Sequence, residues 1–226
     1  MNPSARNRPA VLFFDVNETL IDLAPLKNRI DEVLLTEGAA TLWFTTMLQY
    51  SLVMTVGDRY APLSEIGVAT LQMIARNHDV VLGDSEAREI VGAMRSLPAH
   101  DDVLPALVEL KGMGFQLVAL TNSSNDAVAA QLSNAGIGKY FDRQLSVESV
   151  SWYKPDRRVY RWAADQLQQA PGDAMLVAAH GWDVAGAKWA GLQTAFVERP
   201  GQHLFPLAPE PDLHVADLSA LVEVFR

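Results

Sequence analysis

The sequence contains no cysteine among its 226 residues. This absence excludes disulfide bonds, a thiolate nucleophile and sulfur-ligated metal sites. Positive charge is also scarce, since 18 Lys and Arg residues stand against 27 Asp and Glu residues and the net charge is -9. Nucleic acids and anionic membranes bind positively charged surfaces, so we expect neither of them as a partner.

Long apolar runs are missing as well. The run nearest the N-terminus, residues 10–14, is too short for the apolar region of a signal peptide. The longest uncharged stretch, residues 39–57, is interrupted by Thr, Gln, Ser and Tyr, which makes it a poor membrane span. We interpret this stretch as a buried or interface helix and expect a cytoplasmic protein.

Short apolar runs that end in polar clusters organise the rest of the chain. Continuous apolar runs are typical of strands buried on both faces of a parallel sheet, and helical patterns separate them. The predicted strands cover residues 10–14, 116–120, 174–179, 193–197 and, as an edge strand, 213–215; predicted helices cover residues 104–112, 124–135 and 155–168. This alternation predicts an α/β fold with a doubly wound, Rossmann-like parallel sheet, which binds ligands at the carboxyl ends of its strands.

One long region departs from this alternation. Residues 21–97 contain no convincing strand and predict several helices, over residues 26–35, 40–56, 63–76 and 84–94. Because the region lies between the first two strands, it is an insertion that stands over the strand ends. We therefore expect a helical cap at residues 21–97 and a core formed by residues 1–20 and 98–226.

Asp15 is the first polar residue after the first predicted strand. A carboxylate at this position faces the crevice at the strand ends, where backbone N–H groups of the following turn stabilise an anion. Such a carboxylate can act as a nucleophile that forms a covalent ester or acyl phosphate. The alternative is an aspartate that only shapes the turn, and position alone does not separate the two.

Four further polar residues follow later strands or precede helices. Lys154 precedes Pro155 and can pair with Asp15 or a bound anion, or it is simply solvated. Thr121 and Asn122 can bind a substrate carboxylate or cap the helix that begins near residue 124. Asp183 can orient Lys154 and activate water, or cap the helix that follows it.

The order of these residues resembles the haloacid dehalogenase superfamily over essentially the whole chain. The matching features are Asp-x-x-x-Thr-Leu at residues 15–20, Thr-Asn-Ser at 121–123, Lys-Pro-Asp at 154–156 and Trp-Asp at 182–183. The (S)-2-haloacid dehalogenases are more similar still, because Tyr-Lys-Pro-Asp-x-Arg-Val-Tyr is matched at residues 153–160 and Trp-Asp-x-x-Gly-Ala at 182–187.

The resemblance implies a hydrolase in which Asp15 displaces the 2-substituent of a small carboxylic acid and water hydrolyses the resulting aspartyl ester to a 2-hydroxy acid. Thr19, Thr121 and Lys154 would hold the Asp15 carboxylate, Tyr160 would support Lys154, and Asp183 would position the water. The expected catalytic residues are Asp15, Thr19, Lys154 and Asp183; the expected substrate-binding residues are Val16, Asn17, Trp43, Phe44, Leu48, Thr121, Asn122, Tyr160, His180 and Trp182.

Phosphatases of the superfamily differ from this chain at two positions. They usually carry a second Asp two residues after the nucleophile, where this chain has Asn17, and an acidic Mg²⁺ ligand at the position of Ala179. Asn17 cannot act as an acid, and Ala179 offers no oxygen to Mg²⁺. We therefore expect no metal and no cofactor, and we place phosphatase activity behind carbon-centre hydrolysis.

The leaving group is where the chain departs from the dehalogenases. Phe44 occupies the position of their halide-binding Arg, His180 replaces an Asn beside the substrate, and Ala178 replaces a Ser. An aromatic wall attracts a cationic group, so the alternative is an amine leaving group, as in the ring opening of azetidine-2-carboxylate. His180 can protonate such an amine, donate a hydrogen bond or have a structural role only.

Two further expectations concern activity and assembly. A catalytically silent member of the superfamily is the non-enzymatic alternative, although the chain retains Asp15, Lys154 and Asp183 together. We expect a homodimer, since dimers in this family often pack through the cap, and the helix carrying Trp43, Phe44, Met47 and Leu48 is the candidate interface. The alternative for Phe44 is an apolar core residue of that helix.

Overall fold

The computed structural model describes residues 8–226. Residues 1–7, part of the N-terminal segment in which no signal peptide is expected, lie outside the described residues. Six parallel strands form one sheet in the order β3-β2-β1-β4-β5-β6. The strands are β1 (Val11–Phe14), β2 (Gln116–Thr121), β3 (Arg143–Ser146), β4 (Ala174–Ala178), β5 (Gln193–Val197) and β6 (Leu213–Val215). The predicted α/β class and doubly wound parallel sheet are confirmed.

The register of the central strands brings the predicted polar clusters together. Phe14 at the end of β1 lies beside Ala119 of β2 on one side and Val177 of β4 on the other. The three strands therefore end at the same level, and the residues that follow them share one edge of the sheet. All four residues of β1 are buried, because helices cover both faces of the sheet.

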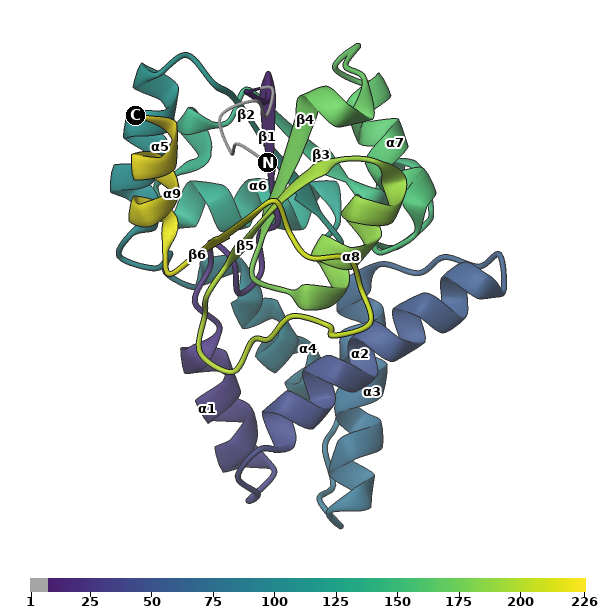
Figure 1. Ribbon diagram of the computed structural model, residues 1–226. Helices are drawn as coiled ribbons and strands as arrows, with labels where there is room; N and C mark the ends of the chain where they lie inside the picture. Colours follow the sequence, from purple (N-terminus) through teal and green to yellow (C-terminus); the bar gives the residue numbers. More distant parts are fainter. Residues whose placement is uncertain (1–7) are drawn as a thin grey trace.

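Five helices flank the sheet. They are α5 (Val103–Gly112), α6 (Asn125–Asn134), α7 (Arg157–Asp165), α8 (Gly181–Ala190) and α9 (Leu218–Phe225). Helices α5 and α9 pack together on one face, and α7 and α8 pack together on the other (Figure 1).

The inserted region contains four helices, called the cap helices below. They are α1 (Ala24–Val33), α2 (Ala39–Val56), α3 (Leu63–Asn77) and α4 (Asp84–Gly92), followed by the 3-10 turn η2 (Ala93–Ser96). They project beyond the carboxyl ends of the strands (Figure 1). Helices α2 and α3 approach closely at Gly67, where the Trp43 indole donates to the Gly67 carbonyl at 2.9 Å.

Several sequence-based expectations need correction. Helix α7 begins at Arg157 and not at Pro155, because the Asp156 side chain caps the helix by accepting from the Arg158 N–H. Asp183 does not cap α8, since that helix begins at Gly181 and Asp183 lies in its first turn. Strand β3 and helix α9 were not predicted; β3 escapes the apolar pattern because it starts with the exposed Arg143 and Gln144.

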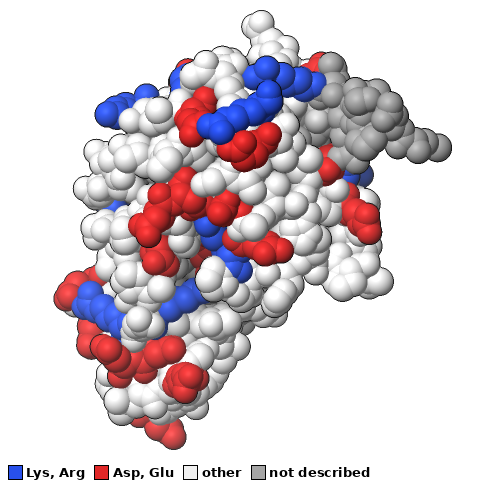
Figure 2. Space-filling view, turned by 60° about the vertical axis from the view of Figure 1, so that its left-hand side comes forward, with Lys and Arg blue, Asp and Glu red and all other residues white. Residues whose placement is uncertain are grey.

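Three further observations concern the predicted dimer interface, the surface charge and membrane spans. Trp43, Phe44 and Met47 of α2 are buried within the chain, so they do not offer the exposed surface that a subunit interface requires; the homodimer itself stays a prediction. Acidic and basic side chains are interspersed on the face drawn in Figure 2. No helix within residues 8–226 has the length and apolarity needed to cross a membrane.

Candidate active site

Asp15 lies directly after β1, and its side chain is almost completely buried. Its backbone N–H donates to the Val177 carbonyl, which extends the pairing with β4 by one residue. Three side chains contact the carboxylate: Lys154 Nζ lies 2.8 Å from Oδ1, Thr19 Oγ1 donates to Oδ2 at 2.8 Å, and His180 Nδ1 lies 3.0 Å from Oδ2. Burial alone would raise the pKa of Asp15, but Lys154 and His180 lower it well below its usual range, so the carboxylate is ionised.

Lys154 is fully buried and links two carboxylates. Its ammonium donates to Asp15, to Asp183 Oδ2 at 2.6 Å and to the Leu120 carbonyl at 3.0 Å. Burial would lower the pKa of Lys154, but the attraction of Asp15 and Asp183 raises it and keeps the amine charged. The three acceptors use all three N–H groups, so Lys154 is held in one position.

Asp183 is held from the other side by Tyr160. The Tyr160 hydroxyl donates to Asp183 Oδ1 at 2.5 Å, while Lys154 occupies Oδ2. Burial raises the pKa of Asp183 even though Lys154 opposes this effect, and the nearby Asp15 carboxylate raises it further. Asp183 is therefore a stronger base than an exposed aspartate.

Thr19 fixes the second oxygen of Asp15. Its hydroxyl accepts from the Ala179 N–H at 2.9 Å, which leaves the hydroxyl proton to point at Asp15 Oδ2. The backbone after β4 thus orients a donor that comes from the turn after β1. This link depends on the parallel register of β1 and β4.

His180 is enclosed by aromatic rings and carboxylates. Its ring stacks on Phe44 at a centroid distance of 6.0 Å and on Trp182 at 5.0 Å, and its Nε2 lies 2.8 Å from Glu18 Oε2. Burial opposes the charged ring, but Asp15 and Glu18 outweigh it and raise the pKa of His180 from 6.5 to about 9. His180 is therefore an imidazolium at neutral pH, with an N–H directed at each carboxylate.

Glu18 is a member of this centre that the sequence-based prediction missed. It is buried in the turn between Asp15 and Thr19, at a φ of 60° that non-glycine residues rarely adopt. A buried glutamate cannot be recognised from a polar turn sequence. The sequence offered one indication of this contact, namely a glutamate in the turn after β1 together with a histidine after β4.

The remaining predicted site residues either support the turns at the strand ends or belong to the apolar surroundings of the site. Asn122 and Thr121 support the turn after β2: the Asn122 carboxamide oxygen accepts from the Lys154 backbone N–H at 2.9 Å, and the Thr121 hydroxyl accepts from the Ser123 N–H. Asn17 bonds Ser123 and Gln131 rather than Asp15. Val16 is buried, Trp43 packs edge-on against Phe44, and Leu48 is half-buried on the same helix.

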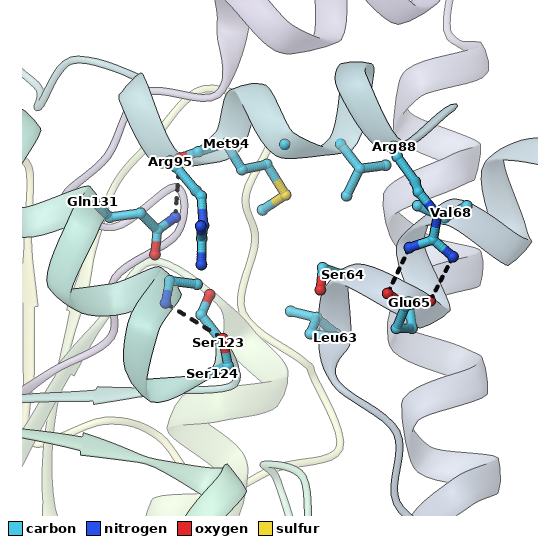
Figure 3. A pocket seen from close by; sticks show the side chains of 13 residues that line it. Leu63, Ser64, Glu65, Val68, Arg88, Met94, Arg95, Ser123, Ser124 and Gln131 are labelled. Atoms are coloured by element: carbon cyan, nitrogen blue, oxygen red, sulfur yellow. Dashed lines mark hydrogen bonds and ion pairs between the residues drawn. The ribbon is translucent and has the colours of Figure 1, made fainter. Parts of the chain in front are cut away.

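A pocket of about 310 Å³ lies between the cap helices and the core, next to the turn after β2 (Figure 3). Ser123, Ser124 and Gln131 line the core side, and the Arg95 side chain extends toward the two serines in Figure 3. Hydrogen bonds from Gln131 to Asn17 and from Asn17 to Ser123 join the pocket wall to the turn that follows Asp15. The pocket therefore reaches the turn after Asp15 only through these hydrogen bonds.

The residues around Asp15 do not fit the Mg²⁺ ion that superfamily phosphatases hold. Within residues 8–226 no group of His, Asp and Glu side chains is arranged to hold a metal ion. The partners of the Asp15 carboxylate are the ammonium of Lys154 and the imidazolium of His180, both of which repel a divalent cation. Ala179 supplies no oxygen ligand.

The fold and the centre together define a class. A parallel α/β sheet carries a buried, ionised aspartate after its first strand, with helices inserted between the first and second strands and a lysine that pairs the aspartate with a second one. The family model of the haloacid dehalogenase-like hydrolases matches residues 9–191. The chain belongs to this family and is a hydrolase.

Individual relatives agree with this assignment. The chain is 31% identical over 215 residues to an (S)-2-haloacid dehalogenase of Pseudomonas sp. (strain YL), covering 94% of this chain and 93% of that protein. An (S)-2-haloacid dehalogenase of Pseudomonas sp. (strain CBS-3) is 29% identical over 188 residues, 82% of this chain and 83% of that protein. The solved structure of the L-2-haloacid dehalogenase of Xanthobacter autotrophicus has the same fold, with a TM-score of 0.89, 23% identity and coverage of 96% and 98% of the two chains.

The charge on His180 makes a prediction about stability. Because its pKa is about 9 in the folded chain and 6.5 when unperturbed, its charge stabilises the fold fully below pH 6.5, and this contribution is lost as pH rises through 9. Urea unfolding should therefore show a fall of about 3 kcal/mol between pH 6.5 and 9.5. The His180→Asn variant should lack this slope, and an equal slope in both proteins would contradict the assigned charge.

Proposed function

We propose that this hydrolase acts at the 2-carbon of a small carboxylic acid, with Asp15 as nucleophile. The observation that carries the proposal is the ionised Asp15 carboxylate, which Lys154, Thr19 and His180 hold at the strand ends. Oδ1 accepts from one of these donors and Oδ2 from two, so Oδ1 has more electron density free for attack. Oδ1 forms a bond to C2 of the substrate, and the 2-substituent departs with its bonding electron pair.

Hydrolysis of the resulting aspartyl ester regenerates Asp15. Water attacks the Asp15 carbonyl carbon, and negative charge develops on Oδ2, where Thr19 and His180 donate hydrogen bonds. The bond from the carbonyl carbon to Oδ1 then breaks, and Oδ1 leaves with the product as the oxygen of a 2-hydroxy acid. Lys154 lies beside Oδ1 and supports this departure, while Asp183 holds Lys154 and positions the water.

The surroundings of Phe44 favour a halide over an amine as leaving group. Phe44 replaces the family's Arg, but the His180 imidazolium stacks against its ring, so the chain places a positive charge beside this position from the core side. A positive charge attracts a departing halide and repels a cationic amine. The amine alternative depends instead on proton donation by His180, whose two N–H groups are directed at Asp15 and Glu18.

Replacement of the nucleophile gives the first test of this mechanism. Asp15→Asn should abolish turnover, a loss of at least about 10³-fold, because the amide is a poor nucleophile. The wild-type enzyme, after a single turnover in ¹⁸O water, should carry one label in the Asp15 carboxylate when its peptides are weighed by mass spectrometry. Turnover by a correctly folded Asp15→Asn protein, or label only in the product, would rule out the ester.

A substrate panel separates the leaving groups. 2-Chloropropionate, fluoroacetate, azetidine-2-carboxylate and a generic phosphate ester are incubated with the enzyme in the presence of EDTA. We expect halide release, measured with an ion-selective electrode, and no phosphate release. Ring opening of azetidine-2-carboxylate without halide release would favour the amine alternative, which Phe44→Arg should impair. Mg²⁺-dependent phosphate release alone would contradict the proposed function, and inertness toward all compounds would favour the silent alternative.

Arg95 is the candidate for guiding an anionic substrate into the pocket between the cap helices and the core. Within residues 8–226 no carboxylate pairs with its guanidinium, whereas Arg88 on the same pocket wall is paired with Glu65 and Asp84. An unpaired cation raises the local concentration of anions against the net charge of -9.

The two arginines provide a matched comparison. Arg95→Gln should raise KM about two- to fivefold at low salt with kcat unchanged, and the effect should fade at 0.5 M salt because ionic screening removes long-range attraction. Arg88→Gln is the control and should leave KM unchanged. Equal effects of both substitutions, or an effect of Arg95→Gln that salt does not alter, would exclude a guiding role.

A further inference from the structure

Glu18 has a position and a set of contacts that the proposed mechanism does not use. It lies in the left-handed region of the backbone and is 6% exposed. A non-glycine residue is strained there and persists only where surrounding contacts hold it. We therefore expect the contacts of the Glu18 side chain to hold this backbone conformation.

The Glu18 carboxylate is fully occupied by donors from separate segments. Oε2 lies 2.8 Å from His180 Nε2 and accepts from Gln202 Nε2 at 3.1 Å, and Oε1 pairs with the Lys27 ammonium of α1. The Glu18 carbonyl oxygen lies 2.9 Å from His100 Nε2. These partners fix the carboxylate, so the direction of its bond to His180 is set by the fold and not by chance packing.

His180 is in turn held by Glu18 and Asp15, one at each ring nitrogen, and its ring stacks against Phe44 and Trp182. The charged groups that face it are Asp15 from the end of β1 and Glu18 from the following turn. Lys154 lies beyond Asp15, with its ammonium 5.9 Å from the Trp182 ring, and Lys27 lies beyond Glu18. The cap side contributes the uncharged ring of Phe44.

We infer that Glu18 is a positioning residue, which keeps His180 doubly protonated so that its Nδ1–H donates to Asp15 Oδ2 throughout the reaction. The role of this donor is clearest when Asp15 is esterified: the negative charge of Asp15 is then lost, and Glu18 is the carboxylate that remains in contact with the ring. The imidazolium is thereby retained for the hydrolysis step, in which charge develops on Oδ2. This inference rests on the proposed ester mechanism for its catalytic consequence, but not for the charge of His180.

A pocket of about 320 Å³ gives direct access to Glu18 from outside the cleft of Figure 3. It is lined by Glu18, Asp22, Lys27, His100, Arg199 and Gln202, among others, and shares no lining residue with the pocket that Arg95 borders. A small carboxylate that enters this pocket can reach the position of a truncated Glu18 side chain without competing for the substrate path.

The charge of His180 is tested by NMR. Titration of the imidazole ¹⁵N signals of the wild-type protein, assigned by their loss in His180→Asn, should show a doubly protonated ring through neutral pH. Glu18→Gln should lower the His180 titration midpoint by about one pH unit or more, since one of two adjacent carboxylates is removed. Asp22→Ala changes the same pocket without touching His180 and should leave the midpoint in place. An unchanged midpoint in Glu18→Gln would overturn the inference, whether or not any substrate is turned over.

The catalytic consequence is tested by kinetics. The substrate is a haloacid that the wild-type enzyme hydrolyses. Glu18→Gln should lose activity on the alkaline side first, so that the basic limb of its plot of kcat against pH moves to lower pH. The Asp15 ester should accumulate in this variant, as measured by mass spectrometry of quenched samples. Formate should restore part of the activity of Glu18→Ala in a saturable manner and should not affect Asp22→Ala. A uniform loss at every pH, with no ester accumulation and no rescue by formate, would reduce Glu18 to a structural role. A wild-type protein that hydrolyses no tested substrate but has a charged His180 would contradict the proposed function and leave the inferred role of Glu18 in charging His180 intact.

Discussion

The contact on which the rest of the centre depends is the buried ammonium of Lys154 between Asp15 and Asp183. A fully buried lysine is costly unless its charge is compensated, and each of these aspartates would be equally costly without the lysine. The three groups therefore stabilise one another in their charged forms, and the removal of any one leaves an uncompensated charge. Their interdependence explains how the Asp15 carboxylate stays ionised in a buried position.

Backbone geometry brings these charges together from segments far apart in the sequence. The parallel register of β1 with β2 and β4 places Asp15, the turn at Asn122 and the Ala179 N–H at one edge of the sheet. Asn122 then fixes the Lys154 backbone through its side-chain oxygen, and Ala179 orients Thr19. The site is thus assembled by main-chain hydrogen bonds at strand ends, which are rigid, rather than by flexible side chains alone.

The parts of the structure that the sequence predicts are those in which local pattern and tertiary role agree. Apolar runs identified the central strands, and the polar residues after them were candidates for one site. The resemblance to the haloacid dehalogenases, rather than the pattern alone, implied the contacts of Lys154 with Asp15, Asp183 and Tyr160. The start of α7 was predicted at Pro155 because proline is common at the first helical position. The helix begins at Arg157 instead, because the Asp156 side chain forms its N-cap. Strand β3 was missed because an edge strand with exposed polar residues has no apolar run.

Within the site, the charge of His180 was the feature that the sequence predicted least well. In the sequence, Phe44 is the loss of a positive group, and His180 is a separate substitution whose role stays open. In the folded chain the Phe44 and His180 rings are stacked and Glu18 contacts Nε2 of His180, so three residues far apart in the sequence form one unit. The two adjacent carboxylates raise the pKa of His180 to about 9, and no local pattern reveals that Glu18 turns inward rather than toward solvent.

This unit also bears on how an acidic protein binds an anion. Asp15, Glu18 and Asp183 are balanced by Lys154, His180 and Lys27, so the buried centre carries no excess negative charge despite the overall value of -9. The His180 imidazolium, held by Glu18, places one of these positive charges 3.0 Å from Asp15 Oδ2. In the proposed mechanism, negative charge develops on this same oxygen during hydrolysis of the ester, so the stabilisation that His180 provides falls on the second chemical step.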